Sequence, residues 1–488
     1  MKTACIIGGG IGGLTVGALL AREGYRVTLL EKNRTIGGGL QSFVRHHRHF
    51  DPCMHIAGGL QPGGNIWRIL DYLGITDKVV AENYRDVIVY NGKHIVLPNG
   101  RDAWIEAVGE GRHKEELAAY VDALYRLVGT ESLFSLQAHR STTESSPLLS
   151  LSAKQLIELY ISSDIIRRRL AYIAPLYGGT DDSPALLHAL TTVLHIEGTY
   201  ALVPSASSLA NALAGVIAAA GGRVVSGTAV DSMVYTCNRV DAVCCGNECY
   251  SADCYVGAIP IKALIDIAPQ PAFSTAFRRR MAAAPQSHSA FCLYGILKPD
   301  TMRQRNESYF ISRTDADPWI PDDVDKQWPQ SLYLMTRSDP ANPLFADTMT
   351  IMAPMLYERV AQWEGSTAGH RPNDYCSWKE LLAHQALTMA REAVGDFELE
   401  YLETSSPLTL RHYTGNCRGS CYGLHSSVNN MAATTMSPRT RMTNLFVAGQ
   451  DVNFHGMVGT TLSSVLTAEA ILGDNVIVGQ LSQNRQTI

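Results

Sequence analysis

Three glycines near the start of the chain have the spacing of a phosphate-binding turn. Gly8, Gly10 and Gly13 follow the pattern G-x-G-x-x-G within the segment Thr3–Lys32. The first glycine permits a tight turn, the second lets the backbone approach a pyrophosphate, and the third lets a helix pack closely on a sheet. Glu31 stands where a carboxylate can accept hydrogen bonds from a ribose diol. These residues predict that an ADP moiety binds here.

The segments around these glycines supply the elements that must position them. The apolar run Ala4–Ile7 is typical of a strand that is buried on both faces of a parallel sheet. Ile11–Arg22 has an apolar helical face, Gly24 ends this helix, and Tyr25–Leu30 is a second predicted strand. The start of such a helix offers free N–H groups to phosphates. The unit is a βαβ dinucleotide-binding motif, which alone does not choose between FAD and NAD.

A second glycine cluster, Gly37–Gly39, directly follows the ribose-binding strand. It lets the backbone approach the same dinucleotide from its other side, which NAD-binding Rossmann domains do not need. The two glycine clusters together resemble the FAD-dependent family of phytoene desaturases, carotenoid isomerases and retinol saturases. Many members of that family carry Arg where this chain has Gly39. A cation for the pyrophosphate is therefore missing or comes from elsewhere, with Arg34 as a candidate.

The segment Phe50–Gly58 is similar to the part of this family that enters the flavin and substrate region. It reads F-D-x-x-x-H-x-x-G, and the resemblance implies that Asp51 and His55 lie near the site. The chain departs from the family at Pro52 and Cys53, where relatives have a small pair such as Thr-Gly. A hydrogen-bonded core histidine is the alternative interpretation of His55. The His-rich stretch before it is predicted to be the turn of a hairpin, not a metal site, because adjacent strand residues point to opposite faces.

The C-terminal part carries the strongest second signal. A predicted strand ends in Ala448-Gly449, a polar and glycine-rich bend runs to Thr460, and a small-residue helix is predicted over Thr461–Leu472. The resemblance implies that the ribityl chain and isoalloxazine ring bind here, with N–H groups at a helix start near Gly459 directed at the flavin. Because the two halves of the dinucleotide are assigned to opposite ends of the chain, FAD is the expected cofactor.

The resemblance implies a set of site residues, carried over position by position. For proton handling we expect His55, Tyr413 and His455 as catalytic residues, with Glu403 as a further candidate, and no metal ligands. The expected cofactor-binding residues are Gly8, Gly10, Gly12, Gly13, Glu31, Lys32, Gly38, Gly39, Val230, Gly449, Gln450, Asp451, Gly459 and Thr460.

The expected fold is α/β, with a Rossmann-like FAD-binding domain and a discontinuous α+β substrate domain, as in amine oxidases and desaturases. We assign residues 1–71, 184–271 and 402–488 to the FAD-binding domain, and residues 72–183 and 272–401 to the substrate domain. Ser132–Ser150 is predicted to be a surface loop, and Arg167–Arg169 a solvated helix face. The other elements predicted in the substrate domain are helices at Lys114–Val128, Ala153–Ser162 and Leu381–Val394 and strands at Phe291–Leu297, Ser331–Arg337 and Thr348–Met355.

Bulk composition limits the partners. A net charge of −5 gives no electrostatic case for binding nucleic acid or an anionic membrane surface. The longest uncharged run, Gly198–Gly222, contains Pro204 and several polar residues, so no membrane span is predicted. Eleven cysteines without a CxxC pair favour reduced thiols of a cytoplasmic protein over a metal site. We therefore expect a cytoplasmic protein, at most attached to a membrane peripherally.

The expected function is that of an FAD enzyme acting on carbon–carbon bonds of a polyene or isoprenoid lipid, by desaturation, saturation or isomerisation. One alternative keeps the fold and is an amine or protoporphyrinogen-type oxidase that uses O2. Another is a flavin-free lipid-binding chaperone, against which the intact glycines and Glu31 argue. The electron partner and the direction of the reaction stay open.

Overall fold

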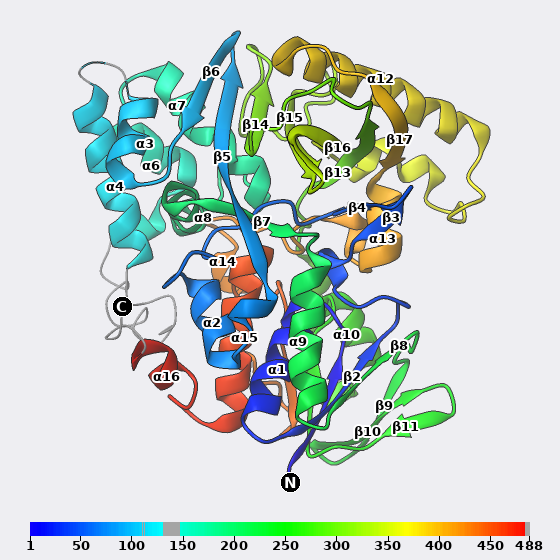
Figure 1. Ribbon diagram of the computed structural model, residues 1–488. Coiled ribbons are helices and arrows are strands. Elements are labelled where there is room, and N and C mark those ends of the chain that lie inside the picture. The colour runs from blue at the N-terminus through cyan, green and yellow to red at the C-terminus, as the bar shows by residue number, and fades with distance from the viewer. Residues whose placement is uncertain (110, 112, 130–146, 484–488) are drawn as a thin grey trace.

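A five-stranded parallel sheet forms the lower half of the molecule in Figure 1. The computed structural model describes residues 1–109, 111, 113–129 and 147–483. The central strand is buried on both faces, which explains its uninterrupted apolar sequence. In spatial order the strands are β18 (Leu445–Val447), β12 (Cys254–Gly257), β1 (Thr3–Ile7), β2 (Arg26–Glu31) and β8 (Arg223–Ser226).

Helices from distant parts of the chain cover this sheet. Helix α1 (Ile11–Arg22) packs against α9 (Ser207–Ala219) and α15 (Gly456–Leu472), and the three lie together in Figure 1. The predicted βαβ motif is confirmed. The remaining helices of this half are α2 (Asn65–Leu73), α10 (Ile261–Ile267), α11 (Thr275–Ala283), α14 (Met431–Thr434) and α16 (Val478–Gln483).

An eight-stranded sheet organises the upper half. Seven strands follow the order β17 (Leu399–Ser405), β13 (Ser289–Leu297), β16 (Asn342–Met355), β15 (Ser331–Asp339), β14 (Glu307–Ser312), β5 (Val80–Tyr90) and β6 (Lys93–Leu97). The eighth strand, β7 (Thr199–Val203), pairs with the first half of β5. It lies within residues 184–271, which the sequence assigned to the FAD-binding domain, so the sheet joins the two parts of the chain.

The eight-stranded sheet separates two apolar layers. On β13, Phe291 and Leu293 pack in one core with α12 (Asn373–Val394), whereas Cys292 and Tyr294 face the other core. The second core contains the helices at the upper left of Figure 1. They are α3 (Arg101–Val108), α4 (His113–Val128), α6 (Ala153–Tyr160), α7 (Asp164–Leu170), the 3₁₀ segment η4 (Ala171–Tyr177) and α8 (Ala185–Glu197).

Two small sheets complete the strands. One is the hairpin of β3 (Phe43–Arg45) and β4 (Arg48–Phe50), as the His-rich turn predicted. The other has the order β11 (Glu248–Tyr250), β10 (Arg239–Cys245) and β9 (Ser232–Thr236). Here the expectation of reduced thiols throughout is wrong, because Cys244 and Cys249 face each other across β10 and β11 and form a disulfide.

Several predicted boundaries differ from the structure. Helix α15 begins at Gly456, five residues before the predicted start, so Gly459 lies in its first turn. Helix α12 begins at Asn373 and not at Leu381. Arg169 is buried and donates to the carbonyl of Val108, so the prediction of a wholly solvated arginine face is wrong. The predicted loop at Ser132–Ser150 lies mostly outside the described residues. None of the helices that the structure describes is both long and apolar enough to span a bilayer.

Candidate active site

The first glycine loop forms a cradle in which side chains would clash with the backbone at Gly8 and Gly13 but not at Gly10. A Cβ atom at Gly8, where φ is +107°, would lie 2.5 Å from the carbonyl oxygen of Ala258. A Cβ atom at Gly13 would overlap the carbonyl oxygen of Gly8, so helix α1 can begin close to the sheet only with glycine there. At Gly10 the nearest atom to a built Cβ is 3.9 Å away, in Gly38. Space for a phosphate therefore remains in front of Gly10.

Glu31 fixes the relation between the loop and the second strand. Its carboxylate accepts hydrogen bonds from the backbone N–H of Gly9 at 2.7 Å and of Asn33 at 2.8 Å. Each carboxylate oxygen can accept more than one hydrogen bond, so a ribose diol can still be recognised. The second glycine cluster adds to the cradle, since the N–H of Gly37 donates to the carbonyl of Gly9 at 2.7 Å.

The C-terminal motif closes the cradle from the opposite end of the chain. A Cβ atom at Gly12 would lie 3.0 Å from Cα of Gly449 and 3.3 Å from Cγ2 of Thr460. The hydroxyl of Ser464 on α15 donates to the carbonyl of Gly12 at 3.2 Å. The space around Gly459 is also too small for a side chain, because a Cβ atom there would lie 2.6 Å from Cβ of Phe454. The two motifs that the sequence assigned to one cofactor are thus in direct contact.

Asp451 connects its own segment by hydrogen bonds to the segments of Ile261 and Leu424. Its carboxylate accepts from the backbone N–H of Ile261 at 3.0 Å and of Leu424 at 3.1 Å. Burial raises the pKa of Asp451, while these two hydrogen bonds oppose the rise. Its neighbour Gln450 lines the same cavity and approaches Asn416 at 3.4 Å. Asp451 therefore lines the cavity and also fixes the positions of the two segments that it binds.

One large cavity connects these motifs, with a volume of about 860 Å³. Volumes of about 300–1,000 Å³ are usual for small-molecule and cofactor sites. Its wall includes every cofactor-binding residue expected from the sequence except Gly13, which instead packs α1 against the sheet. The segment 228–230 reaches the cavity beside Glu31, because the N–H of Thr228 donates to the carbonyl of Glu31 at 2.8 Å. Val230 therefore lines the same cavity as Glu31.

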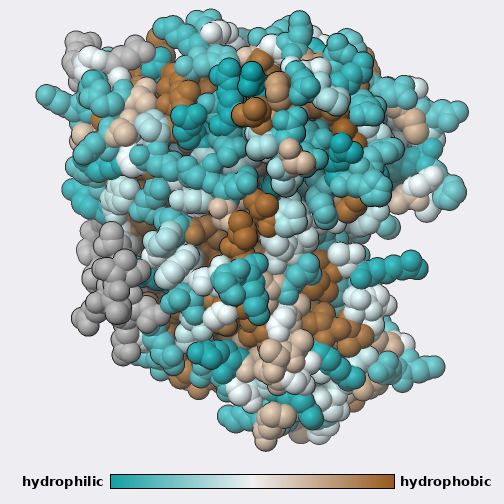
Figure 2. Space-filling view, viewed as in Figure 1, coloured by the Kyte–Doolittle hydropathy of each residue, from teal (hydrophilic) through white to brown (hydrophobic). Residues whose placement is uncertain are grey.

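The cavity continues into the upper half, where its wall is largely apolar. Helix α8 supplies Leu187, Leu190 and Leu194, and the sheet supplies Tyr333 and Met352. In Figure 2 patches of hydrophobic residues show near the middle of this face of the molecule, among hydrophilic ones. A polar cradle thus leads into an apolar space.

Two of the expected catalytic histidines line the cavity as neutral rings. Burial lowers the pKa of His55 to about 4, and the nearby Arg337 lowers it further. No described atom is a hydrogen-bond partner of its Nε2. Burial also lowers the pKa of His455 to about 4. Its Nε2 donates to the carbonyl of Tyr177 at 2.7 Å, which leaves Nδ1 without the proton.

The structure places Tyr413 beside Asn33, in the cavity wall that also includes Glu31. Its side chain is 56% exposed, and its carbonyl accepts from the side-chain amide of Asn33 at 3.0 Å. Lys32 lies beside Gly415 in the same region. This position favours a contact of Tyr413 with the nucleotide over a role in proton transfer. Glu403 pairs with Arg45 at 2.6 Å and is not part of the cavity wall.

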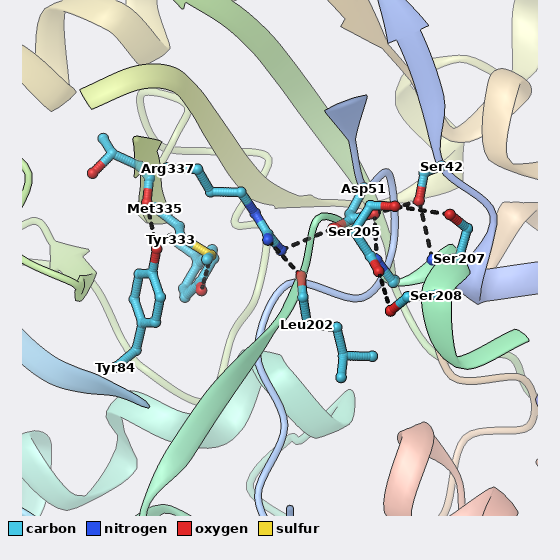
Figure 3. A network of polar contacts seen from close by, with 12 residues as sticks. Ser42, Asp51, Tyr84, Leu202, Ser205, Ser207, Ser208, Tyr333, Met335 and Arg337 are labelled. Carbon is cyan, nitrogen blue, oxygen red and sulfur yellow. Dashed lines mark hydrogen bonds and ion pairs between the residues drawn. The ribbon is translucent and has the colours of Figure 1, made fainter. Parts of the chain in front are cut away.

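A buried ion pair holds the segment of His55 against the upper sheet, as Figure 3 shows. Arg337 on β15 donates to the carboxylate of Asp51 at 2.9 Å and to the carbonyl of Leu202 at 2.6 Å. Asp51 also accepts from the hydroxyl of Ser42 at 2.6 Å and from the N–H of Ala206, at the start of α9, at 3.0 Å. Asp51, expected near the site, therefore fixes where β4, β15 and α9 meet.

Sequence reasoning missed the polar residues of the upper cavity wall. His195 lies on α8, and its Nδ1 is 2.6 Å from the carboxylate of Asp86 on β5. Three thiols, those of Cys53, Cys292 and Cys421, also line the cavity. In the sequence, an acidic residue within the apolar strand pattern D-V-I-V-Y was the one available signal, and no spacing links it to His195. Within the described ranges, no group of three or more metal-ligating side chains is close enough to hold a metal.

Known proteins with similar sequences include dinucleotide-binding domains and oxidoreductases. A family profile described as an NAD(P)-binding Rossmann-like domain matches residues 6–73. All-trans-retinol 13,14-reductases of Homo sapiens and Rattus norvegicus are 25% and 26% identical to the chain. These matches cover 96% and 97% of this chain and 85% and 86% of the relatives. A phytoene desaturase of Phycomyces blakesleeanus is 50% identical over 48 residues, which are 10% of this chain and 8% of that protein.

Solved structures share the architecture at low sequence identity. An oxidoreductase of Methanosarcina mazei has a TM-score of 0.66 at 14% identity and covers 96% of this chain and 99% of its own. Cyclohexylamine oxidase of Brevibacterium oxydans has a TM-score of 0.61 at 14% identity and covers 99% of both chains. This likeness shows the fold alone, a Rossmann-like domain joined to a mixed sheet. The near-full-length sequence matches go further: the chain is an oxidoreductase and is similar in sequence to retinol 13,14-reductases over almost its whole length, and to a phytoene desaturase over a short segment.

Proposed function

We propose that the protein binds FAD and acts on carbon–carbon bonds of a polyene or isoprenoid lipid. The observation that carries this proposal is the single cavity that runs from the double glycine cradle into an apolar space under the upper sheet. The named substrates of the relatives, retinol and phytoene, are both apolar polyenes, which the apolar wall suits. Residues 1–71, 184–271 and 402–488 would carry the cofactor. Residues 72–183 and 272–401 would form the substrate space together with α8, which supplies Leu187, Leu190 and Leu194.

The described residues fit FAD at both of its ends. Glu31 and Val230 would hold the adenosine, and the N–H groups behind Gly10 would face the pyrophosphate. The first turn of α15, with Gly459 and Thr460, would direct its N–H groups at the flavin ring. When bound, FAD supplies hydride exchange through its N5 atom. The protein supplies the apolar space that excludes water from the reacting bond.

Two alternatives share the fold. An amine or protoporphyrinogen-type oxidase would resemble the amine oxidases among the structural neighbours. Among the described residues of the cavity wall the one lysine is Lys32, at the ribose end, so no lysine is available above the flavin position. A flavin-free lipid chaperone would not need the tight contacts at Gly12 and Glu31.

The cofactor assignment is tested by flavin content. The purified protein should carry flavin absorption and release FAD on denaturation, because the cradle encloses the whole dinucleotide. Gly10→Val should abolish binding, because its side chain enters the space for the phosphate. Gly215→Val is the matched control, since nothing lies within 4 Å of a Cβ at this position on α9. Retention of FAD by Gly10→Val at the wild-type level would contradict the phosphate-loop assignment.

The substrate assignment is tested with a panel of compounds under anaerobic conditions. All-trans-retinol, phytoene and lycopene are incubated with the oxidised or the reduced holoenzyme, and putrescine is the comparison amine. We expect a shift in the polyene absorption with one redox state of the flavin. If no polyene changes and the amine yields hydrogen peroxide in air, the protein is an amine oxidase and the proposal is wrong.

A further inference from the structure

A carboxylate–histidine pair lies in the upper half, away from the motifs that bind the cofactor. Asp86 on β5 and His195 near the end of α8 are both almost fully buried, with side-chain exposures of 3% and 7%. Oδ2 of Asp86 is 2.6 Å from Nδ1 of His195. Because an ionised carboxylate can only accept, Nδ1 carries the proton and donates it. The pair therefore fixes the orientation and the tautomer of the imidazole.

A third residue holds the carboxylate in place. The hydroxyl of Tyr172 in η4 donates to Oδ2 of Asp86 at 2.9 Å, so this oxygen receives two hydrogen bonds from two different segments. The other oxygen, Oδ1, is buried and has no partner among the described residues. A buried carboxylate with so few donors favours a cation beside it. A protonated His195 would supply that charge.

His195 differs in this respect from the other histidines of the cavity wall. Nδ1 faces Asp86, and the hydrogen bond found for the ring within the described part of the chain is the one at Nδ1, on the side away from Nε2. The ring itself forms part of the cavity wall. His55 and His455 have no carboxylate partner, and burial holds the pKa of each at about 4. Of the three, His195 alone has the partner that an acid in neutral solution requires.

We infer that His195, oriented by Asp86 and Tyr172, is the proton-transfer residue of the reaction on the polyene. This inference rests on the proposed function. In the direction of saturation, one carbon of the double bond receives a hydrogen and two electrons as hydride from the reduced flavin. The neighbouring carbon receives the second hydrogen as a proton from Nε2 of His195. The imidazole then regains a proton from water, and the flavin is left oxidised. His195 is the catalytic residue, and Asp86 and Tyr172 are positioning residues.

Other titratable groups surround the pair and define the controls. Burial raises the pKa of Tyr333 on β15, and the charge of Asp86 contributes to this rise. Burial likewise raises the pKa of Tyr125 on α4 to about 12. It also raises the pKa of Glu197, which ends α8 and lines the cavity. Glu197 is the group whose titration is most easily confused with that of His195.

The test uses anaerobically photoreduced holoenzyme mixed with all-trans-retinol, with flavin reoxidation followed by stopped flow at several pH values. The wild-type rate should fall as the pH rises and His195 loses its proton. His195→Gln should lower the rate at least about 100-fold and remove this pH dependence. Asp86→Asn should move the fall in rate to lower pH, because the imidazolium loses its partner.

Two variants separate this role from a structural one. His188→Gln removes another buried histidine of α8, which bonds to Tyr120 at 2.6 Å and is not part of the cavity wall. It should lower stability and leave the pH dependence in place. Glu197→Gln should also keep the pH dependence. Flavin content and retinol binding, the latter measured by fluorescence, should be unchanged in His195→Gln.

The outcomes are distinguishable. If the wild type reduces retinol and His195→Gln does so at the same rate and with the same pH dependence, the inference is wrong and the proposed function stands. The same holds if Glu197→Gln, but not His195→Gln, removes the pH dependence. If the reduced wild type transfers no hydride to any polyene of the panel, and its oxidised form takes none, the proposed function fails and the inference fails with it.

Discussion

At the scale of single residues, the buried histidines make stability depend on pH. The pKa of His55 is about 4 in the folded protein, against an ordinary value of 6.5. The unfolded chain therefore binds the proton more tightly, and folding stability is lost as the pH falls from about 6.5 towards 4. Between pH 7.5 and pH 5 this one group should remove about 2 kcal/mol of the free energy of unfolding.

Replacement of His55 tests this prediction. His55→Gln keeps a polar side chain of similar size and cannot titrate in this range. The difference between the free energies of unfolding at pH 7.5 and pH 5, measured with urea, should shrink by about 2 kcal/mol relative to the wild type. His47→Gln, on the exposed hairpin turn, is the control and should change nothing. An unchanged difference in His55→Gln would mean that His55 is solvated or already charged.

Residues differ in how far the sequence could assign them. The glycines and Glu31 were predictable because one dinucleotide imposes fixed spacings on a continuous βαβ unit. Asp86 and His195 were not, because they meet only when β5 pairs with β14 and α8 packs under the sheet. Tyr413 was assigned to catalysis by resemblance, whereas its position beside Asn33 depends on how α13 (Pro407–Thr414) packs. Local spacing is visible in a sequence, and convergence of separate elements is not.

At the scale of elements, the periodicity of apolar residues predicted these helices correctly but did not define where each one begins and ends. The helix predicted at Lys114–Val128 is found at His113–Val128. Helix α6 starts at Ala153, as predicted, after a capping box formed by Ser152, and it ends at Tyr160, two residues before the predicted end. The early start of α15 was missed because a Gly-rich bend and a Gly-rich first turn look alike in sequence. The site depends on that turn, so its geometry needed the structure.

The ion pair of Arg337 and Asp51 joins three elements, and its loss should be costly. Removing one partner of a buried pair leaves an uncompensated charge and typically costs about 3–5 kcal/mol. Arg337→Met should therefore lower the free energy of unfolding by this amount, because Asp51 would keep only its hydrogen bonds to Ser42 and Ala206. The double variant Arg337→Met/Asp51→Asn should recover part of the loss.

The measurement is urea unfolding of the two single variants and the double variant. The control is Arg48→Met, which removes an ion pair to Asp347 with side-chain exposures of 37% and 20%. Partly exposed pairs contribute about 0–1 kcal/mol, so this variant should change little. Equal losses in Arg337→Met and Arg48→Met would contradict the view that Arg337 and Asp51 form the main tie between β15 and α9.

At the scale of the whole molecule, the cofactor site exists only where the two ends of the chain meet. The contact of Gly12 with Gly449 and Thr460 joins α1 to the turn before α15, more than 400 residues apart in the sequence. Gly12→Ala would place a methyl group 3.0 Å from Cα of Gly449 and 3.2 Å from its backbone nitrogen. Backbone at this distance must move, so the cradle should open on the flavin side.

We expect Gly12→Ala to lower both the melting temperature and the affinity for FAD, and to lower the affinity more in a titration of the apoprotein with FAD. Gly215→Ala is the opposite case, since it lies in the middle of α9 with no atom within 4 Å of the added methyl group. That change should raise stability by about 0.5–1 kcal/mol and leave FAD affinity unchanged, because alanine restricts the unfolded chain more than glycine does. If Gly12→Ala binds FAD as tightly as Gly215→Ala, the two ends of the chain do not jointly form the site, and the cofactor depends on the N-terminal cradle alone.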